Sequence, residues 1–203
     1  MTGVGGFATT NDPGLAVTLR SLMNHGRDSI YLAIDDDRGA TGERLKEIVA
    51  KRFSFVHHGH SFRCTELEAA LGLGQIEQRA DLMARRRANA DRLLAGLAGL
   101  EDDLVLPRRQ PDRDHVFMMM PLQVRRGDKR ALVNYLEERL IETRDLMPLL
   151  SQPAFRDAPG ADLARFPVAR RIGEAGFYLG CHPYLTAAEV DYMGATVRAF
   201  FHR

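Results

Sequence analysis

Residues 59–72 read Gly-His-Ser-Phe-Arg-Cys-Thr-Glu-Leu-Glu-Ala-Ala-Leu-Gly, a short polar turn followed by a run typical of a helix. Thr65 and Glu68 have the spacing of a capping box, in which the threonine oxygen accepts from a free backbone N–H and the glutamate reaches back. An apolar stripe predicts that the helix continues to about Leu97, with a bend or break between Gln78 and Asp81. This helix therefore connects the segment before residue 59 to a second unit behind it.

The segment before this stretch predicts part of an α/β domain. Val4 to Thr10 is expected to form a strand, because the glycines around its start allow close backbone approach. Asp12 followed by Pro13 predicts a helix start, and apolar spacing carries that helix to about Asn24. Further elements are expected in chain order: an extended run at residues 29–34, a charged helix at 43–51 and a strand at 53–56.

Strand and helix patterns alternate after the long helix, which predicts a small layered α/β unit. The expected strands lie at residues 104–106, 115–123, 141–144 and 176–181. The expected helices are capped by Asp128, begin at Val168, and are capped by Thr186, with a loop-rich segment at 148–167. We therefore expect two parts: residues 1–80 as a remnant of a larger domain, and residues 81–203 as the interdomain helix and a small C-terminal α/β domain.

Composition excludes several classes of protein. The chain has 203 residues and a formal net charge of +1, so charge does not favour nucleic acid or an anionic membrane as a partner. Its two cysteines, Cys64 and Cys181, lie far apart and form no CxxC pair, which suits a reducing cytosol. No apolar run approaches a membrane span, and the start lacks the features of a signal peptide. We therefore expect a cytoplasmic protein.

Histidines and a cysteine gather just before the long helix, in the sequence His57-His58-Gly59-His60 with Cys64 beyond. Imidazoles and thiolates are suitable zinc ligands. However, adjacent residues of an extended segment point to opposite faces, and Cys64 has no CxxC partner. The pattern favours a polar loop rim, and we expect no metal site.

Arg63 is the strongest binding candidate from the residues themselves. A helix N-terminus presents free N–H groups and partial positive charge, and an arginine beside it adds a bidentate clamp for phosphate or carboxylate. A buried structural salt bridge is the competing interpretation. Two weaker candidates lie further on. Arg144, on one strand face with Glu142, is expected to make a cross-strand ion pair or a substrate contact, and His182 is expected to have a positioning role at a strand end.

Several separated segments together resemble the DegT/StrS group of pyridoxal-phosphate-dependent nucleotide-sugar aminotransferases. Residues 2–12 resemble its "TGEGG…TND" segment, and residues 59–72 resemble its "GYNYRMTELQAALGLAQL" segment. The other matching segments are residues 19–27, 141–144, 148–149, 152–155 and 181–186, the last resembling "lPcHPyLT". The order is that of the family, and the matches cover nearly the whole chain.

The resemblance implies a fold type I pyridoxal-phosphate enzyme, normally about twice this length and a homodimer. It implies transfer of an amino group from an amino acid to a keto-sugar nucleotide, in the biosynthesis of sugars, antibiotics or polysaccharides. Ser61 and Arg63 are then expected to help bind the cofactor phosphate of the neighbouring subunit or the substrate, and Arg144 and His182 to line the substrate site. The family's asparagine is Ser61 here, whose hydroxyl can still donate to phosphate, and its glutamate in TGEGG is Val4.

The resemblance also places the Schiff-base lysine upstream of Met1, so the chain is expected to lack catalytic residues of its own and to be inactive alone. Lys46, Lys51 and Lys129 lie in charged sequence contexts, are expected to be exposed, and are not credible substitutes.

Two alternatives stay open. The long segment between Arg27 and Phe53 resembles the related keto-sugar dehydratases, in which a histidine replaces the lysine and the cofactor stays as pyridoxamine phosphate. In the second alternative, the chain is a non-catalytic truncated remnant or an interaction module, because residues 1–80 would expose apolar surface without a cover.

Overall fold

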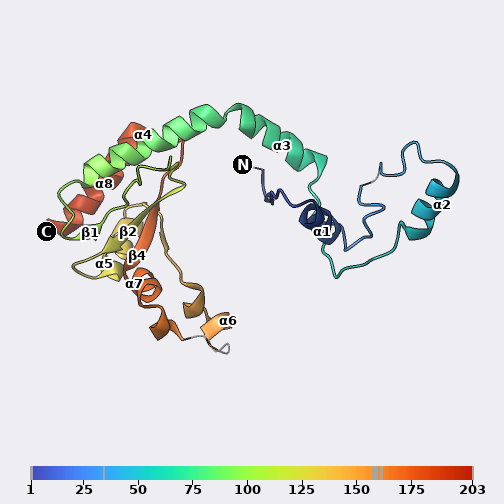
Figure 1. Cartoon of the computed structure of the whole chain (residues 1–203). Helices are drawn as coiled ribbons and strands as arrows, with labels where there is room; N and C mark the ends of the chain where they lie inside the picture. The colour runs from blue at the N-terminus through green and yellow to red at the C-terminus, as the bar shows by residue number, and fades with distance from the viewer. Residues whose placement is uncertain (1, 34, 157–159, 161, 203) are drawn as a thin grey trace. The chain divides into compact units, whose positions relative to one another are not determined.

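The computed structural model describes residues 2–33, 35–156, 160 and 162–202 (Figure 1). Backbone contacts divide the chain into two compact units, one ending at Glu77 and one beginning at Gln78. The domain identities expected for residues 1–80 and 81–203 stay a prediction.

The first unit contains three helices, α1 (Pro13–Met23), α2 (Gly42–Lys51) and α3 (Glu66–Glu77). The carboxylate of Asp12 caps α1 by accepting from the backbone N–H groups of Gly14 and Leu15, at 2.8 and 3.0 Å. The capping box before α3 is also present. The N–H of Thr65 donates to the Glu68 carboxylate at 2.8 Å, and the N–H of Glu68 donates to the Thr65 hydroxyl at 3.4 Å. These local signals were sufficient to predict where α1 and α3 begin.

The strands predicted in the first unit are not formed. Residues 4–10 make no ladder, residues 29–33 form turns and bends, and residues 53–56 contribute one bridge residue; Ile34 lies outside the described residues. In the described part of this unit, β pairing is limited to the isolated bridges Asn24↔Ser61 and Arg27↔Phe55. A strand is stable only beside a continuous neighbour, and the described residues supply these segments with no partner longer than a single bridge.

The second unit begins with α4 (Arg79–Leu97), which is separated from α3 by the non-helical Gln78, as the sequence predicts. Its antiparallel sheet has the strand order β1-β2-β4-β3. The strands are β1 (Leu104–Val105), β2 (Met119–Val124), β3 (Thr143–Asp145) and β4 (Gly176–Gly180). β2 begins four residues later than predicted, because Phe117 has a φ of 55° and interrupts the extended backbone.

The remaining helices of the second unit are α5 (Lys129–Glu137), α6 (Pro153–Arg156), α7 (Pro167–Ala175) and α8 (Ala187–Phe201), with short 3₁₀ turns η1 (Leu149–Ser151) and η2 (Leu163–Arg165). The predicted caps Asp128 and Thr186 are both present. α4 packs on α8 at a glycine contact, where a Cβ on Gly194 would lie 3.4 Å from the Cα of Gly96. One hydrophobic cluster joins these helices to the sheet, with Leu97, Leu122 and Phe177 fully buried.

Arginines of α4 tie that helix to the rest of the second unit. Arg86 donates to the backbone carbonyls of Met118 at 3.2 Å and Cys181 at 3.1 Å. Arg92 makes a two-pronged ion pair with Asp191 of α8, at 2.5 and 2.6 Å, and the hydrogen bond lowers the pKa of that carboxyl. Among the described residues, no helix combines the length and apolar composition that crossing a membrane requires.

Candidate functional site

The loop of residues 57–63, called here the crossing loop, lies across the C-terminal end of α1. It is held by backbone hydrogen bonds rather than by side chains, so its path is set by the fold of this unit. The bonds run from His60 N to Leu22 O at 2.7 Å, from His25 N to His60 O at 2.8 Å, and from Phe62 N to Met23 O at 3.0 Å. The two candidate binding residues Ser61 and Arg63 therefore have a fixed backbone.

Two glycines make this crossing possible. Gly26 has a φ of 81°, and a Cβ built on it would lie 1.9 Å from the carbonyl oxygen of His57. A Cβ on Gly59 would lie 2.0 Å from the backbone nitrogen of Gly26. Both distances are far inside van der Waals contact with backbone atoms that cannot rotate away. The crossing therefore requires glycine at both positions, a non-local requirement that sequence reasoning missed.

Ser61 and Arg63 are exposed on the crossing loop, just before the N-terminus of α3. Neither the Ser61 hydroxyl nor the Arg63 guanidinium has a hydrogen-bond or ion-pair partner among residues 2–33, 35–156, 160 and 162–202. The buried salt bridge that competed for Arg63 is therefore not formed within the described part of the chain. Both side chains are available to an anion from outside the chain.

Arg63 also lines a hollow of about 550 Å³ between α1 and the loop that follows it. Asn24 lies at this hollow and is 7 % exposed. Its amide nitrogen donates to Leu32 O at 2.5 Å, whereas its Oδ1 has no partner within the part of the chain that the structure describes. The wall combines cationic and apolar side chains with the carboxylate of Asp36 and the polar Ser29. It includes Val17, Arg20, Met23, Ile30 and Arg44.

Arg144 lies in the second unit, on β3. Its Nη2 and Nε donate to Oε1 of Glu142 at 2.7 and 3.1 Å, and this hydrogen-bonded pair raises the pKa of the guanidinium. The partner is two residues away on the same segment rather than across the sheet. Arg144 is exposed and faces Tyr178 of β4 in the strand register. It is accessible to a ligand, with one carboxylate already bound.

His182 follows β4 in the second unit and is exposed. Its Nδ1 accepts from the backbone N–H of Tyr184 at 3.3 Å, and its carbonyl accepts from the Asn89 amide at 2.8 Å. The neighbouring Cys181 is buried, and burial raises the pKa of its thiol. A thiolate at Cys181 is therefore disfavoured, in line with the geometric objection to a Cys181–His182 catalytic pair.

The structure thus places Ser61 and Arg63 together in one unit, and Arg144 and His182 in the other. Ser61 and Arg63 belong to the crossing loop, whereas Arg144 lies on β3 and His182 follows the end of β4. The four predicted site residues remain candidates from two separately described units.

The three lysines all have carboxylate partners. Lys46 pairs with Glu43 at 2.7 Å and Lys51 with Glu47 at 3.2 Å. Both are at least half exposed, as expected.

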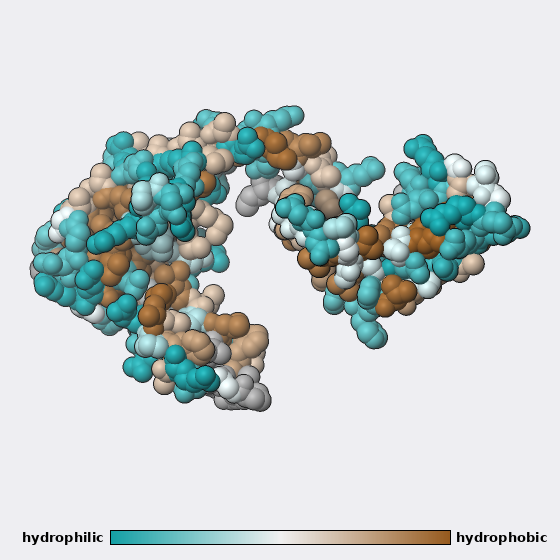
Figure 2. Space-filling model, in the orientation of Figure 1, coloured by the Kyte–Doolittle hydropathy of each residue, from teal (hydrophilic) through white to brown (hydrophobic). Residues whose placement is uncertain are grey.

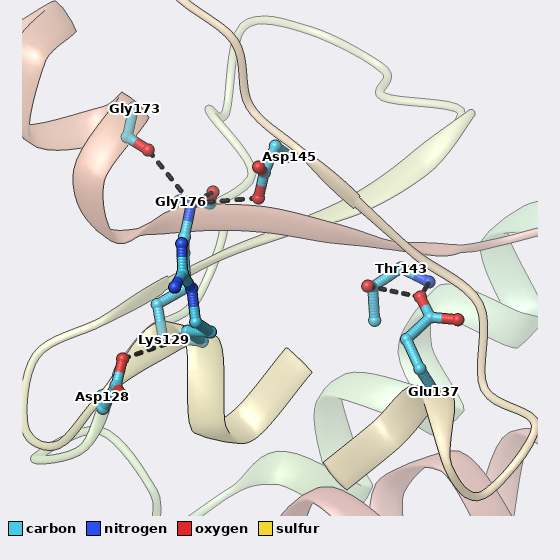
Figure 3. A network of polar contacts seen from close by, with 8 residues as sticks. Asp128, Lys129, Glu137, Thr143, Asp145, Gly173 and Gly176 are labelled. Carbon is cyan, nitrogen blue, oxygen red and sulfur yellow. Dashed lines mark hydrogen bonds and ion pairs between the residues drawn. The ribbon is translucent and has the colours of Figure 1, made fainter. Parts of the chain in front are cut away.

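Lys129 corrects the expectation that every lysine is exposed, since its side chain is only 18 % exposed (Figure 3). Its ammonium donates to the Asp145 carboxylate at 3.0 Å and to the carbonyls of Gly173 at 3.1 Å and Gly176 at 3.4 Å. Three N–H donors meet three acceptors, so Lys129 is a structural cation that joins α5, β3 and the end of α7.

A second polar contact in Figure 3 fixes the start of β3. Oε1 of Glu137 accepts from the backbone N–H of Thr143 at 2.6 Å and from its hydroxyl at 2.7 Å. These bonds lower the pKa of Glu137. Glu137 therefore anchors the backbone at Thr143, the residue before Arg144, and no sequence signal marks this contact.

The histidines of the crossing loop do not assemble a metal centre in the described part of the chain. Within residues 2–33, 35–156, 160 and 162–202, no group of three or more His, Cys, Asp or Glu side chains is arranged to hold an ion. His60 instead stacks on Phe62, with ring centroids 4.7 Å apart.

Comparison with known proteins identifies what this arrangement resembles. A model of the DegT/DnrJ/EryC1/StrS aminotransferase family matches residues 1–198. The lipopolysaccharide biosynthesis protein RfbH of Salmonella typhimurium is 28 % identical over 98 % of this chain and 48 % of its own length. The dTDP-4-dehydro-2,6-dideoxy-D-glucose 3-dehydratase of Saccharopolyspora spinosa is 28 % identical over 98 % of this chain and 45 % of its own length.

A solved structure confirms the predicted fold class. The aminotransferase from Psychrobacter cryohalolentis matches 96 % of this chain and 50 % of its own chain, with a TM-score of 0.77 and 23 % identity. The chain therefore has the fold of part of a fold type I pyridoxal-phosphate enzyme. It spans about half the length of the curated relatives it matches.

Proposed function

Because the chain belongs to the DegT/DnrJ/EryC1/StrS aminotransferase family, we propose that it forms one half of an enzyme that transfers an amino group from an amino acid to a keto-sugar nucleotide. Pyridoxal phosphate is the cofactor of this family. The lysine that carries it would come from polypeptide outside this chain, because Lys46, Lys51 and Lys129 are all ion-paired. The proposal includes a homodimer and a cytoplasmic location.

One observation carries this proposal. The crossing loop presents a serine hydroxyl and an arginine guanidinium, both without partners in the described residues, at the start of a capped helix. A guanidinium binds phosphate through two parallel hydrogen bonds, and a serine hydroxyl can donate a further one. The residues present therefore suit the phosphate end of the cofactor, whereas no lysine among them suits its aldehyde.

In this proposal, the four candidate site residues of the chain have positioning roles. Arg63 and Ser61 would hold the phosphate of the cofactor bound to the neighbouring subunit, on a backbone fixed by Gly26 and Gly59. When bound, pyridoxal phosphate supplies an electron sink for the carbon that exchanges the amino group. Arg144 and His182 would contact the nucleotide-sugar substrate from the second unit.

Replacing Arg63 by alanine in the complete enzyme tests this role. We expect cofactor affinity to fall by about tenfold to a hundredfold, because a charged hydrogen bond contributes about 1.5–3 kcal/mol. The measurement is a titration of the cofactor-free enzyme. Arg130→Ala is the matched control, since Arg130 is exposed and its guanidinium has no partner among the described residues. An unchanged affinity in Arg63→Ala would remove Arg63 from the site.

A sugar dehydratase that uses pyridoxamine phosphate is the second candidate function. It is supported by the matched dehydratase of Saccharopolyspora spinosa and by the long segment between Arg27 and Phe53, which contains α2. The codons upstream of Met1 in the genome separate the two reactions. We expect a lysine at the cofactor position; a histidine there would favour the dehydratase, and a closed reading frame would favour a non-catalytic interaction module.

A further inference from the structure

Helix α5 holds strand β3 at both ends. Lys129 is the first residue of α5, and its ammonium donates to the Asp145 carboxylate at 3.0 Å. Glu137 is the last residue of α5, and its Oε1 accepts from the backbone N–H of Thr143 at 2.6 Å. Figure 3 shows both contacts. Arg144 lies between Thr143 and Asp145, so both of its neighbours in the chain are bound to the same helix.

The helix that makes these two contacts is itself fixed to the core. Leu132 and Leu136 of α5 are fully buried in the hydrophobic cluster of the second unit. The Asp128 carboxylate caps the start of the helix by accepting from the N–H of Arg130 at 2.8 Å. A functional side chain is held most precisely when its supports belong to a rigid element. α5 therefore gives the backbone of Arg144 a fixed support.

Lys129 also closes the base of the connection between β3 and β4. Its ammonium donates to the Gly173 carbonyl at 3.1 Å, and the N–H of Leu146 donates to the carbonyl of Gly176 at 3.3 Å. The two ends of the connection lie in close contact, since a Cβ on Gly173 would be 2.6 Å from Cγ of Pro148. One ammonium thus joins the end of β3 to the end of α7.

The connection buries little of itself. None of residues 146–149, 151–155, 160 and 162–175 is buried. Figure 2 shows hydrophobic residues at its surface around α6 and α7, where Phe155 and Val168 are exposed. A segment with few buried side chains moves at low cost in free energy unless other contacts hold it. The position of Asp145, and of the connection that follows it, therefore depends on Lys129.

The side chain of Arg144 lies on the other face of β3. Successive side chains of a strand alternate, so Arg144 points away from the face that carries Thr143 and Asp145, and it lies opposite Tyr178 of β4. Its Nε and Nη2 donate to Glu142, which uses two of the five N–H groups of the guanidinium. The described residues leave the other three N–H groups available, enough for a two-pronged contact with a phosphate.

We propose that Lys129 and Glu137 are positioning residues, which hold Arg144 so that its guanidinium meets the diphosphate of the nucleotide-sugar substrate. The inference rests on the proposed function, in which Arg144 contacts that substrate from the second unit. Lys129 and Glu137 do not touch the substrate, because both act through the residues on either side of Arg144. A cation that only stabilises the fold would change the free energy of unfolding alone, whereas a positioning residue also changes the affinity for the substrate.

Lys129→Met in the complete enzyme tests the proposal. We expect KM for the keto-sugar nucleotide that the parent enzyme turns over to rise about fivefold to tenfold, with kcat changed by less than about twofold, because a diphosphate contact binds the ground state and the transition state alike. Lys129→Arg keeps a cation with several N–H donors and should restore most of the affinity. Lys46→Met removes the same charge from an exposed ion pair of α2 and should leave both constants unchanged. An unchanged KM in a folded Lys129→Met enzyme overturns the proposal.

A double substitution shows whether the effect passes through Arg144. Lys129→Met should raise KM in the parent enzyme and have little further effect in an Arg144→Ala enzyme. Equal fold-changes in both backgrounds overturn the proposal, because Lys129 would then act independently of Arg144. Glu137→Ala removes the acceptor for Thr143 and should raise KM in the same Arg144-dependent way. This second variant decides the question if Lys129→Met does not fold.

The proposed function can fail separately from this inference. A complete parent enzyme that transfers no amino group to a keto-sugar nucleotide removes the proposed function. The same double substitution is then followed by calorimetric titration with inorganic pyrophosphate, with the cofactor bound so that the phosphate site at Arg63 is filled. A loss of affinity in Lys129→Met that requires Arg144 supports the positioning role. Absence of pyrophosphate binding in the parent, or binding that does not depend on Lys129, overturns it.

Discussion

The two units of this chain differ in how they are held together. In the second unit, three helices and a four-stranded sheet share one buried hydrophobic cluster. In the first unit, α1 and α3 begin at side-chain caps and the loops are joined by backbone hydrogen bonds, with Ile48 as the buried hydrophobic residue of its described part. The comparison teaches that capped helices and glycine turns can define local structure, whereas a core requires the rest of a domain.

The largest expected effect on stability is the difference between replacing a phenylalanine in the second unit and replacing one in the first. Phe177→Ala should destabilise the second unit by about 3–5 kcal/mol, because it empties a fully buried site at the centre of the sheet. Phe7→Ala should leave the unfolding of the chain unchanged, since Phe7 is fully exposed. Urea denaturation followed by circular dichroism measures both. Equal losses in the two variants would contradict the difference between the units.

Gly59→Ala should break the crossing in the first unit. The added Cβ would lie 2.0 Å from the backbone of Gly26, so the crossing loop must move, at a cost of about 2 kcal/mol or more. Amide exchange at His60 and Phe62 should accelerate, because their bonds to α1 are lost. Gly74→Ala is the matched control: nothing lies within 4 Å of its Cβ position. Unchanged exchange in Gly59→Ala would mean that the crossing is not formed in solution.

Lys129→Met tests how much the enclosed ammonium of Lys129 contributes to the stability of the second unit. It takes the ammonium donor from the Gly173 carbonyl and from the Asp145 carboxylate, while the Gly176 carbonyl keeps the N–H of Leu146, and we expect a loss of about 1–2 kcal/mol in urea unfolding. Lys46→Met removes an exposed ion pair on α2 and should change stability by less than about 0.5 kcal/mol. Similar small effects from both substitutions would show that the ammonium of Lys129 is not enclosed.

The smallest expected effect is a pH dependence at Glu137. Hydrogen bonds from Thr143 lower its pKa in the folded state below the usual 4.5, so the unfolded chain binds the proton more readily. The carboxylate therefore stabilises the second unit above pH 4.5, and this contribution is lost as the pH falls through the lowered pKa. In Glu137→Gln, unfolding measured across this acidic range should have a flatter pH dependence. A profile identical to that of the parent would exclude the proposed contribution.

Local signals predicted much of the fold. Asp12, Thr65, Asp128 and Thr186 each cap a helix as their sequence context predicts, because a cap depends on residues at most three positions away. Whether the strands of the first unit form could not be predicted from nearby residues, since a strand depends on a neighbour distant in sequence. β2 begins later than predicted because Phe117 has a positive φ, which no residue pattern indicates.

The candidate site was predictable in identity but not in geometry. The motif around Arg63 marked the residue, whereas the Gly26–Gly59 contact that fixes its loop joins positions 33 residues apart. The burial of Lys129 was missed for the same reason, because its acceptors lie on β3 and at the end of α7. Sequence alone cannot place partners that meet only in the folded chain.

Native-state hydrogen exchange of the whole chain, followed residue by residue, tests the central difference most directly. The account predicts the slowest exchange in β2, β4 and α8, at the free energy of global unfolding of the second unit. It predicts fast exchange in residues 5–10 and exchange by local fraying in α3. Equal, cooperative protection of both units in the monomeric chain would contradict it.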